Sequence, residues 1–125
     1  MIRWWLAAAI AVASSQASGQ CAGGHRGGSH GSGIASWYGS AHEGRATASG
    51  QQFQSGHFSA AHPTLPLGTR IRVTRGAASV VVTVSDRFCH PRRSLDLSEA
   101  AAVKLGIRDL GIARVRWTRV KHSHR

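Results

Sequence analysis

The chain has 125 residues, of which 42% are hydrophobic and 17% are charged, and its formal net charge is +11. This length accommodates one compact domain and excludes two. Sixteen lysines and arginines stand against five aspartates and glutamates, so the composition predicts an anionic partner. Nucleic acid is disfavoured as that partner, because the sequence contains no helix-turn-helix, zinc-finger spacing or aromatic RNA-binding motif.

The first 19 residues have the order of a signal peptide. Met1-Ile2-Arg3 precedes an apolar run over residues 4–13 and a small polar stretch that ends at Gly19. The apolar run is about half of the roughly 20 residues that a membrane-spanning helix needs. We therefore expect export to the periplasm or cell envelope, with a mature chain that begins at Gln20. Lipid anchoring at Cys21 is disfavoured, because Gln20 rather than a small residue precedes it.

Outside the cytoplasm the available polyanions are wall glycans that carry carboxylates, phosphate-bearing polymers and membrane surfaces. We expect a monomer that binds wall glycan and associates weakly with anionic surfaces.

Residues 20–32 are rich in glycine and contain His25 and His30, which predicts a flexible arm. These histidines, and the two in the basic tail over residues 121–125, have irregular spacing, so we predict no metal and no cofactor. Cys21 and Cys89 are the two cysteines, and in an oxidising compartment a disulfide between them would tie the arm to the domain. Two unpaired thiols remain the alternative.

The predicted folded unit covers residues 33–120 and is mainly β. Segments rich in β-branched and aromatic residues predict strands at Ile34–Tyr38, Thr69–Thr74, Val80–Val84 and Ala113–Val120. The continuous Val80-Val81-Val82 run is typical of a strand buried on both faces. One helix is expected over Glu99–Leu105, capped by Ser98 and closed by Gly106. With so small a core, the sheet is expected to close into a barrel.

Two of the five carboxylates stand out as candidate catalytic groups. Asp86 ends the Val80–Val84 strand, where a rigid scaffold can present a reactive group to solvent. Asp96 lies between two leucines directly before the helix, so apolar neighbours anchor its main chain. The alternative for each is a strand-end or turn aspartate that accepts main-chain N–H groups.

Cleavage of a glycan chain requires an acid that protonates the leaving oxygen. If an internal hydroxyl of the substrate attacks in place of water, one carboxyl can act first as acid and then as base, which suits a chain with few acids. His62, in the proline-stiffened loop Ala60–Pro66, carries protons at neutral pH and could orient or assist the acid. A loop histidine bonded to a main-chain carbonyl is its alternative.

Six segments in this order resemble the rare lipoprotein A family: Ala35–Gly39, Arg45–Gly50, Ala60–Pro66, Leu67–Val73, Val84–Arg87 and Leu95–Ser98. The resemblance covers roughly residues 33–120. It implies a six-stranded double-psi β-barrel with one or two short helices, related to expansins. It also implies an endolytic lytic transglycosylase that acts on peptide-stripped peptidoglycan and leaves 1,6-anhydro-muramyl ends.

In this resemblance the family's catalytic positions fall on Asp86, Asp96 and His62. Basic side chains such as Arg45, Arg87 and Arg93 would attract the free lactyl carboxylates of stripped glycan. The residues expected to contact the substrate are Tyr38, Thr47, Gln51, Gln54, Arg45 and Arg87.

The chain departs from the family pattern in two places, and the first departure favours a second function, a glycan-binding module that does not cleave. The family's two acids in Gly-Glu-Arg-Phe-Asp are replaced by Gln51 and Gln54, which cannot transfer a proton at neutral pH. The loop after Asp86 also lacks the family's glycine and proline. A binding module would stack Trp37, Tyr38 and Phe53 on sugar faces. Core packing is the alternative for these residues and is favoured for Trp37 but not for Tyr38. The retained aspartates and histidine favour the enzyme.

Overall fold

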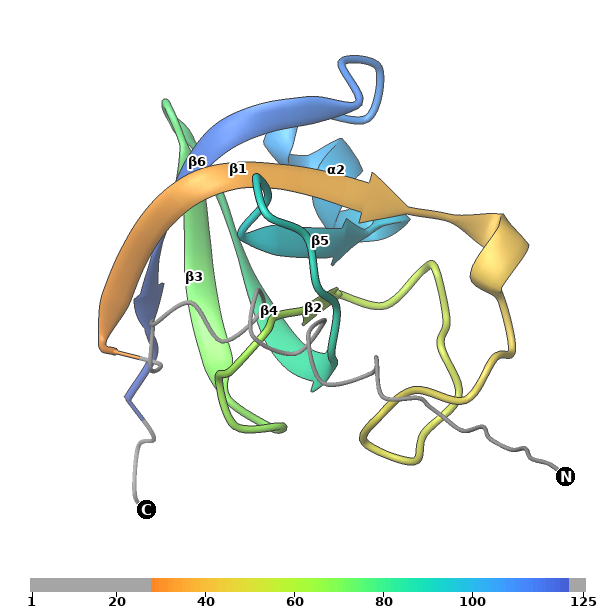
Figure 1. The fold of residues 1–125 in the computed structure, drawn as a ribbon. Coiled ribbons are helices and arrows are strands. Elements are labelled where there is room, and N and C mark those ends of the chain that lie inside the picture. Colours follow the sequence, from red (N-terminus) through yellow and green to blue (C-terminus); the bar gives the residue numbers. More distant parts are fainter. Residues whose placement is uncertain (1–27, 122–125) are drawn as a thin grey trace, which may run out of the picture.

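Six strands close into a barrel in the order β1-β5-β2-β4-β3-β6 (Figure 1). The structure is a computed structural model that describes residues 28–121. Its elements are β1 His30–Tyr38, the short 3-10 helix η1 Ser40–His42, β2 Ser59–Ala61, β3 Arg70–Arg75, β4 Ala78–Asp86, β5 Leu95–Ser98, α2 Glu99–Leu105 and β6 Ile112–Arg119. The prediction of a mainly β, six-stranded barrel with short helices is confirmed.

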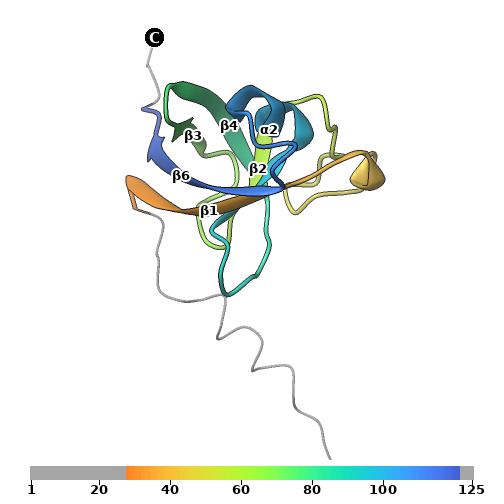
Figure 2. The same ribbon diagram turned by 90° about the horizontal axis from the view of Figure 1, so that it is seen from above.

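Two of the strand pairs, β1 with β5 and β2 with β4, are parallel, and the others are antiparallel. The parallel pairs join segments far apart in the sequence, so long connections must cross the ends of the barrel. The longest connection runs from η1 to β2 and extends away from the barrel as a broad loop (Figures 1 and 2). Ala48 and Ser49 of this loop bond to Asp86 and Ser85 at the end of β4.

Alternating side chains of the strands fill the barrel. Ile71 and Val73 of β3 face inward, as do Val80, Val82 and Val84 of β4. Val81 is only half-buried and pairs with Arg72 on the outer face, so the expectation of a strand buried on both faces is wrong. The aliphatic part of an arginine can cover such a valine without closing the face to solvent.

Helix α2 has the predicted bounds and caps. Ser98 accepts a hydrogen bond from the main-chain N–H of Ala101, and Gly106 closes the helix in the left-handed conformation with a φ of 74°. Ala101, Ala102 and Leu105 attach the helix to the core.

Strand β1 begins at His30, three residues before the expected domain boundary, so residues 30–32 belong to the barrel rather than to the arm. The glycines at the start of β1 allow neighbouring side chains to pack directly against the main chain. A Cβ on Gly31 would lie 2.6 Å from Cζ2 of Trp117, and one on Gly33 would collide with the side chain of Ser94.

The expected signal peptide, Cys21 and the end of the basic tail lie outside the described residues. Within residues 28–121, no helix is long and apolar enough to cross a bilayer.

Candidate functional site

The two candidate aspartates lie in one row across the outside of the barrel. Ala61 of β2 is the register partner of Asp96 on β5 and of Asp86 on β4. Neighbouring strands lie about 4.7–4.9 Å apart, so the main chains at the two aspartates are roughly 10 Å apart. Because Ala61 carries only a methyl group, no larger side chain stands between them in that row.

A β-bulge places Asp86 in this row. By strict alternation Asp86 would share the inward face of Val84, which is fully buried in the core. The register shifts between Ala60 and Ala61, so that Ala60 pairs with Val84 and Ala61 pairs with Asp86. One extra residue in β4 therefore turns the aspartate out of the core, as bulges commonly do beside functional sites.

The carboxylate of Asp86 is held by main-chain donors. Its Oδ1 accepts hydrogen bonds from the N–H groups of Ala48 and Arg87, both at 2.9 Å. The first of these bonds also fixes the loop that contains Ala48 over the end of β4. Asp86 thus has the bonding expected of a strand-end aspartate. No residue of the described chain donates to its Oδ2, which remains available to a ligand.

Asp96 has a different environment. Its Oδ1 accepts a hydrogen bond of 2.8 Å from the hydroxyl of Ser36, its register partner on β1. Burial raises the pKa of Asp96 above its ordinary value, and the negative charge of Asp86 raises it further. The Ser36 bond and the charges of Arg93 and His42 act in the opposite direction. The net effect is a raised pKa for Asp96, whereas Asp86 is held by two main-chain N–H donors.

Tyr38 lies near enough to both aspartates to feel their charges, and it packs against Phe53 and His42. Its ring stacks on Phe53 with centroids 4.5 Å apart and meets the edge of His42 at 5.2 Å. Phe53 is itself only 3% exposed. The Tyr38 hydroxyl is buried and has no hydrogen-bond partner among the described residues. Burial, followed by the charges of Asp86 and Asp96, raises the pKa of this hydroxyl well above its usual range, so it is a neutral donor.

His62 is placed near Asp86 through its main chain. Its N–H donates to the Asp86 carbonyl, and its own carbonyl accepts a bond from the guanidinium of Arg87. The buried ring packs edge-on against Trp117 with centroids 5.6 Å apart. Its Nδ1 accepts the main-chain N–H groups of Thr64 and Leu65, at 3.1 and 3.0 Å. These contacts orient the ring within its own loop.

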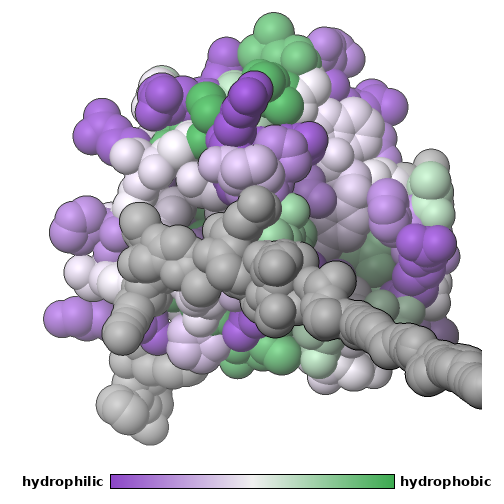
Figure 3. Space-filling model, viewed as in Figure 1, coloured by the Kyte–Doolittle hydropathy of each residue, from purple (hydrophilic) through white to green (hydrophobic). Residues whose placement is uncertain are grey.

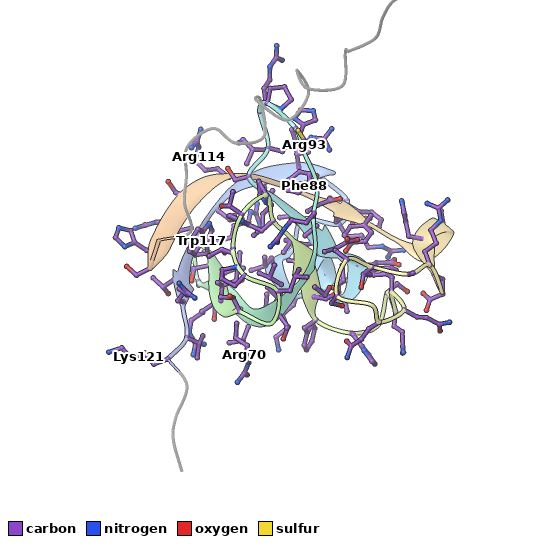
Figure 4. All side chains as sticks on the ribbon, turned by 60° about the horizontal axis from the view of Figure 1, so that its bottom comes forward. Arg70, Phe88, Arg93, Arg114, Trp117 and Lys121 are labelled. Atoms are coloured by element: carbon purple, nitrogen blue, oxygen red, sulfur yellow. The ribbon has the colours of Figure 1, made fainter. Side chains whose placement is uncertain are left out.

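The remaining predicted substrate contacts lie around the loop that binds Asp86. The Thr47 hydroxyl is used inside this loop, where it donates to the Gln51 carbonyl at 2.7 Å. The side chains of Gln51, Gln54 and Arg45 are exposed. Arg93 acts on Asp96 electrostatically, as described above, and lies in the β4–β5 loop with Phe88 (Figure 4). Cys89 of the same loop is disulfide-bonded.

Sequence reasoning missed Ser36 and His42, the two side chains that act on Asp96 and Tyr38 from β1 and η1. Their roles depend on the pairing of β1 with β5, which no local pattern shows.

A separate open hollow of about 430 Å³ lies beside α2, away from the aspartates, and is lined by Ser55, Gly56, Phe58, Glu99, Ala100, Val103 and Lys104. Within the described range, no three His, Cys, Asp or Glu side chains are grouped as metal ligands.

The closed barrel with two interlocked parallel pairs defines a double-psi β-barrel. Solved structures of this shape include the Streptomyces papain inhibitor, with a TM-score of 0.63 and 25% identity over 75% of this chain and 96% of that one. An expansin from Clavibacter michiganensis matches with a TM-score of 0.61 and 26% identity, over 76% of this chain and 52% of the expansin.

The chain belongs to the lytic transglycolase family, whose family model matches residues 30–117. Relatives include the probable endolytic peptidoglycan transglycosylase RlpA of a Synechocystis strain, which is 48% identical over 86 residues, or 66% of this chain and 27% of the relative. The endolytic peptidoglycan transglycosylase RlpA of Neisseria meningitidis serogroup B is 44% identical over 88 residues, or 68% of this chain and 37% of the relative. The chain thus matches well under half of the length of these relatives, and the resemblance seen in the sequence is confirmed.

Proposed function

We propose that this domain is an endolytic lytic transglycosylase that cleaves peptide-stripped peptidoglycan between muramyl and glucosaminyl residues. The observation that carries this proposal is the pair of aspartates flanking Ala61, one half-buried with a raised pKa and the other anchored by main-chain donors. The names of the relatives, which are peptidoglycan transglycosylases, support the same reaction. Such a substrate lies outside the cytoplasm, in agreement with the export and periplasmic location expected from the sequence.

In the proposed mechanism Asp96 is the general acid. Its carboxyl protonates the glycosidic oxygen as the bond from that oxygen to the muramyl C1 breaks. The Asp86 carboxylate stabilises the positive charge that develops at C1. The muramyl 6-hydroxyl then attacks C1, and its proton passes to the Asp96 carboxylate, which restores the acid. One carboxyl thus serves as acid and base, and the product carries a 1,6-anhydro ring.

His62 is proposed to assist by holding this arrangement. Its main-chain bonds to Asp86 and Arg87 join the β2 end to the β4 end, so its loop fixes the carboxylate relative to Ala61. Arg45, Arg87 and Arg93 supply positive charge for the lactyl carboxylates of stripped strands. Gln51 and Gln54, both exposed, are suited to hydrogen bonds with sugar hydroxyls.

A glycan-binding module without cleavage is the second candidate, because Gln51 and Gln54 stand where the family has acids. The packing of the three aromatic residues gives it little support, however. Phe53 is buried, Tyr38 is stacked on Phe53, and the Trp37 indole donates a 3.1 Å bond to the Arg108 carbonyl and packs against the core.

Incubation of the mature protein with peptide-stripped glycan, followed by mass spectrometry, separates the two candidates. The proposal expects anhydro-ended fragments from the wild type and none from Asp86→Asn, with the variant's melting temperature retained. Sedimentation of the wild-type protein with glycan but without fragments would establish the binding module instead.

A further inference from the structure

A single file of arginines runs along the outer face of β3 and β6. Arg70 and Arg72 on β3 are exposed, and the residues between and after them, Ile71 and Val73, are fully buried. On β6, Arg114 and Arg116 are exposed and alternate with the buried Val115 and Trp117. Figure 4 shows Arg70 and Arg114 pointing away from the barrel. We call these four residues, in the order Arg70, Arg72, Arg116 and Arg114, the arginine file.

The register of the two strands places the four residues in this order. Arg72 of β3 pairs with Thr118 of β6, and Thr74 pairs with Arg116. Arg116 therefore lies on the neighbouring strand, two residues farther along the pair than Arg72. Arg114 lies two residues beyond Arg116 in the same direction. Same-face neighbours on a strand are about 6–7 Å apart, so the file is roughly 20 Å long with a nearly constant step. Thr74 and Thr118 place hydroxyl groups between the second and third arginines.

No acidic side chain of the described residues is paired with the arginine file. β1, β3 and β6 contain no Asp or Glu, and the four guanidinium groups make no ion pair or hydrogen bond with the described part of the chain. Other arginines are used by the fold: Arg75 donates to the Leu105 carbonyl, Arg87 to the His62 carbonyl, and Arg108 pairs with Glu99 at 2.9 Å. The charge on the file therefore has no structural function in the barrel.

The file faces away from the aspartates. In the closed strand order, the β3–β6 pair lies across the barrel from the β5–β2 pair that carries Asp96 and Ala61. Hydrophilic side chains project from the side of the molecule on which β1, β3 and β6 lie (Figures 1 and 3). A ligand on the file would leave the two aspartates free.

We propose that the arginine file binds a linear polyol-phosphate polymer in an extended conformation. An extended chain covers about 3.3–3.6 Å per three backbone bonds, so a phosphodiester repeat of six backbone bonds covers roughly 7 Å and matches the step of the file. Guanidinium groups bind phosphate oxygens bidentately, and the threonine hydroxyls can donate to the oxygens between them. The domain would thus be held on a phosphate polymer while its opposite side works on glycan. This inference does not depend on the proposed cleavage.

The spacing and side chains favour this polymer over other polyanions. Stripped glycan carries a carboxylate on every second ring, so its charges are farther apart than one file step. A lipid surface presents phosphates in two dimensions, whereas these cations form one line. Single-stranded nucleic acid is bound through stacking on aromatic side chains, and Trp117, the aromatic residue of these two strands, is only 6% exposed.

Fluorescence anisotropy with labelled poly(glycerol phosphate) tests the inference, with Arg116→Gln compared against Lys104→Gln, which removes the same charge from an exposed position on α2. We expect wild-type binding with a salt slope of about −3, since four contacts release counterions from a flexible strand. Arg116→Gln should weaken binding about tenfold and reduce the slope by about 1, and Arg116→Lys should restore part of the loss. Lys104→Gln should change affinity less than twofold.

Equal weakening by Arg116→Gln and Lys104→Gln would overturn the inference, because binding would then follow net charge alone. Tighter binding to oligothymidylate, or to vesicles containing phosphatidylglycerol, would overturn it in favour of those partners. Cleavage of soluble stripped glycan by Arg116→Gln should equal that of the wild type, so a failure here and a failure of the proposed reaction are distinguishable.

Discussion

Asp86 and Asp96 lie on opposite sides of one strand, β2, and share a single alanine of that strand as their register partner. Asp96 is half-buried and bonded to Ser36, and Asp86 is fixed by two main-chain N–H groups. Two like groups in different environments can take different protonation states, which is the requirement for an acid and an anion at one site.

The Tyr38 hydroxyl is expected to lower the stability of the domain and to raise its catalytic rate. A buried donor without a partner costs about 1–3 kcal/mol, so Tyr38→Phe, which keeps the ring on Phe53, should raise the melting temperature by several degrees. The same variant should have a lower kcat with little change in KM, since the hydroxyl can donate to an aspartate that becomes charged during the reaction. Calorimetry and steady-state kinetics measure the two effects. A variant that is both less stable and fully active would show that the hydroxyl serves packing alone.

The raised pKa of Asp96 predicts a pH-dependent stability difference. Because the folded chain binds this proton more tightly than the unfolded chain, the contribution of Asp96 to stability falls as pH rises from its ordinary value of 3.8 through the folded value. Asp96→Asn keeps an oxygen acceptor for Ser36 and cannot ionise. The variant should therefore be more stable than the wild type at pH 7, and the difference should shrink towards pH 3.5. Denaturant unfolding at both pH values measures this, and a difference that does not change with pH would contradict the account.

Gly31 should not tolerate a side chain. An alanine methyl group would lie 2.6 Å from the Trp117 ring, which closes the barrel beside His62, so Gly31→Ala should destabilise the domain by about 1–3 kcal/mol. Gly56→Ala is the matched control, because no atom lies within 4 Å of its added Cβ. Chemical denaturation of both variants decides between steric packing and a general intolerance of substitution in glycine-rich segments.

The loop over Asp86 offers a gain-of-function test. Gln51 is exposed in the loop whose Ala48 N–H binds Asp86, so Gln51→Glu would restore a carboxyl to the loop that holds Asp86. We expect about a tenfold increase in cleavage rate, at the low end of what a positioned acid or base contributes. Gln52→Glu, the adjacent exposed position, is the control. Equal rates for the two variants would mean that position 51 takes no part in proton transfer.

The sequence was sufficient for part of this architecture. The alternation in β3 and the caps of α2 are local signals, and both elements appear where the sequence predicted them. Strands β2 and β5 were not predicted as strands, because three and four residues are too short to show a period and both are held by pairing on each side. For the same reason Asp86 and Asp96 were found as isolated acids, but their common partner Ala61 and the role of Ser36 were not visible.

The central claim is tested most directly by the rate at which a defined peptide-stripped glycan oligomer is cleaved by Asp96→Asn and by Asp109→Asn. Asp109 is an exposed acid of the α2–β6 turn, so the two variants lose the same charge at different places. The account predicts that Asp96→Asn slows release of anhydro-ended product by at least about 100-fold, as loss of a general acid does, and that Asp109→Asn leaves the rate unchanged. Cleavage by Asp96→Asn at the wild-type rate would contradict it.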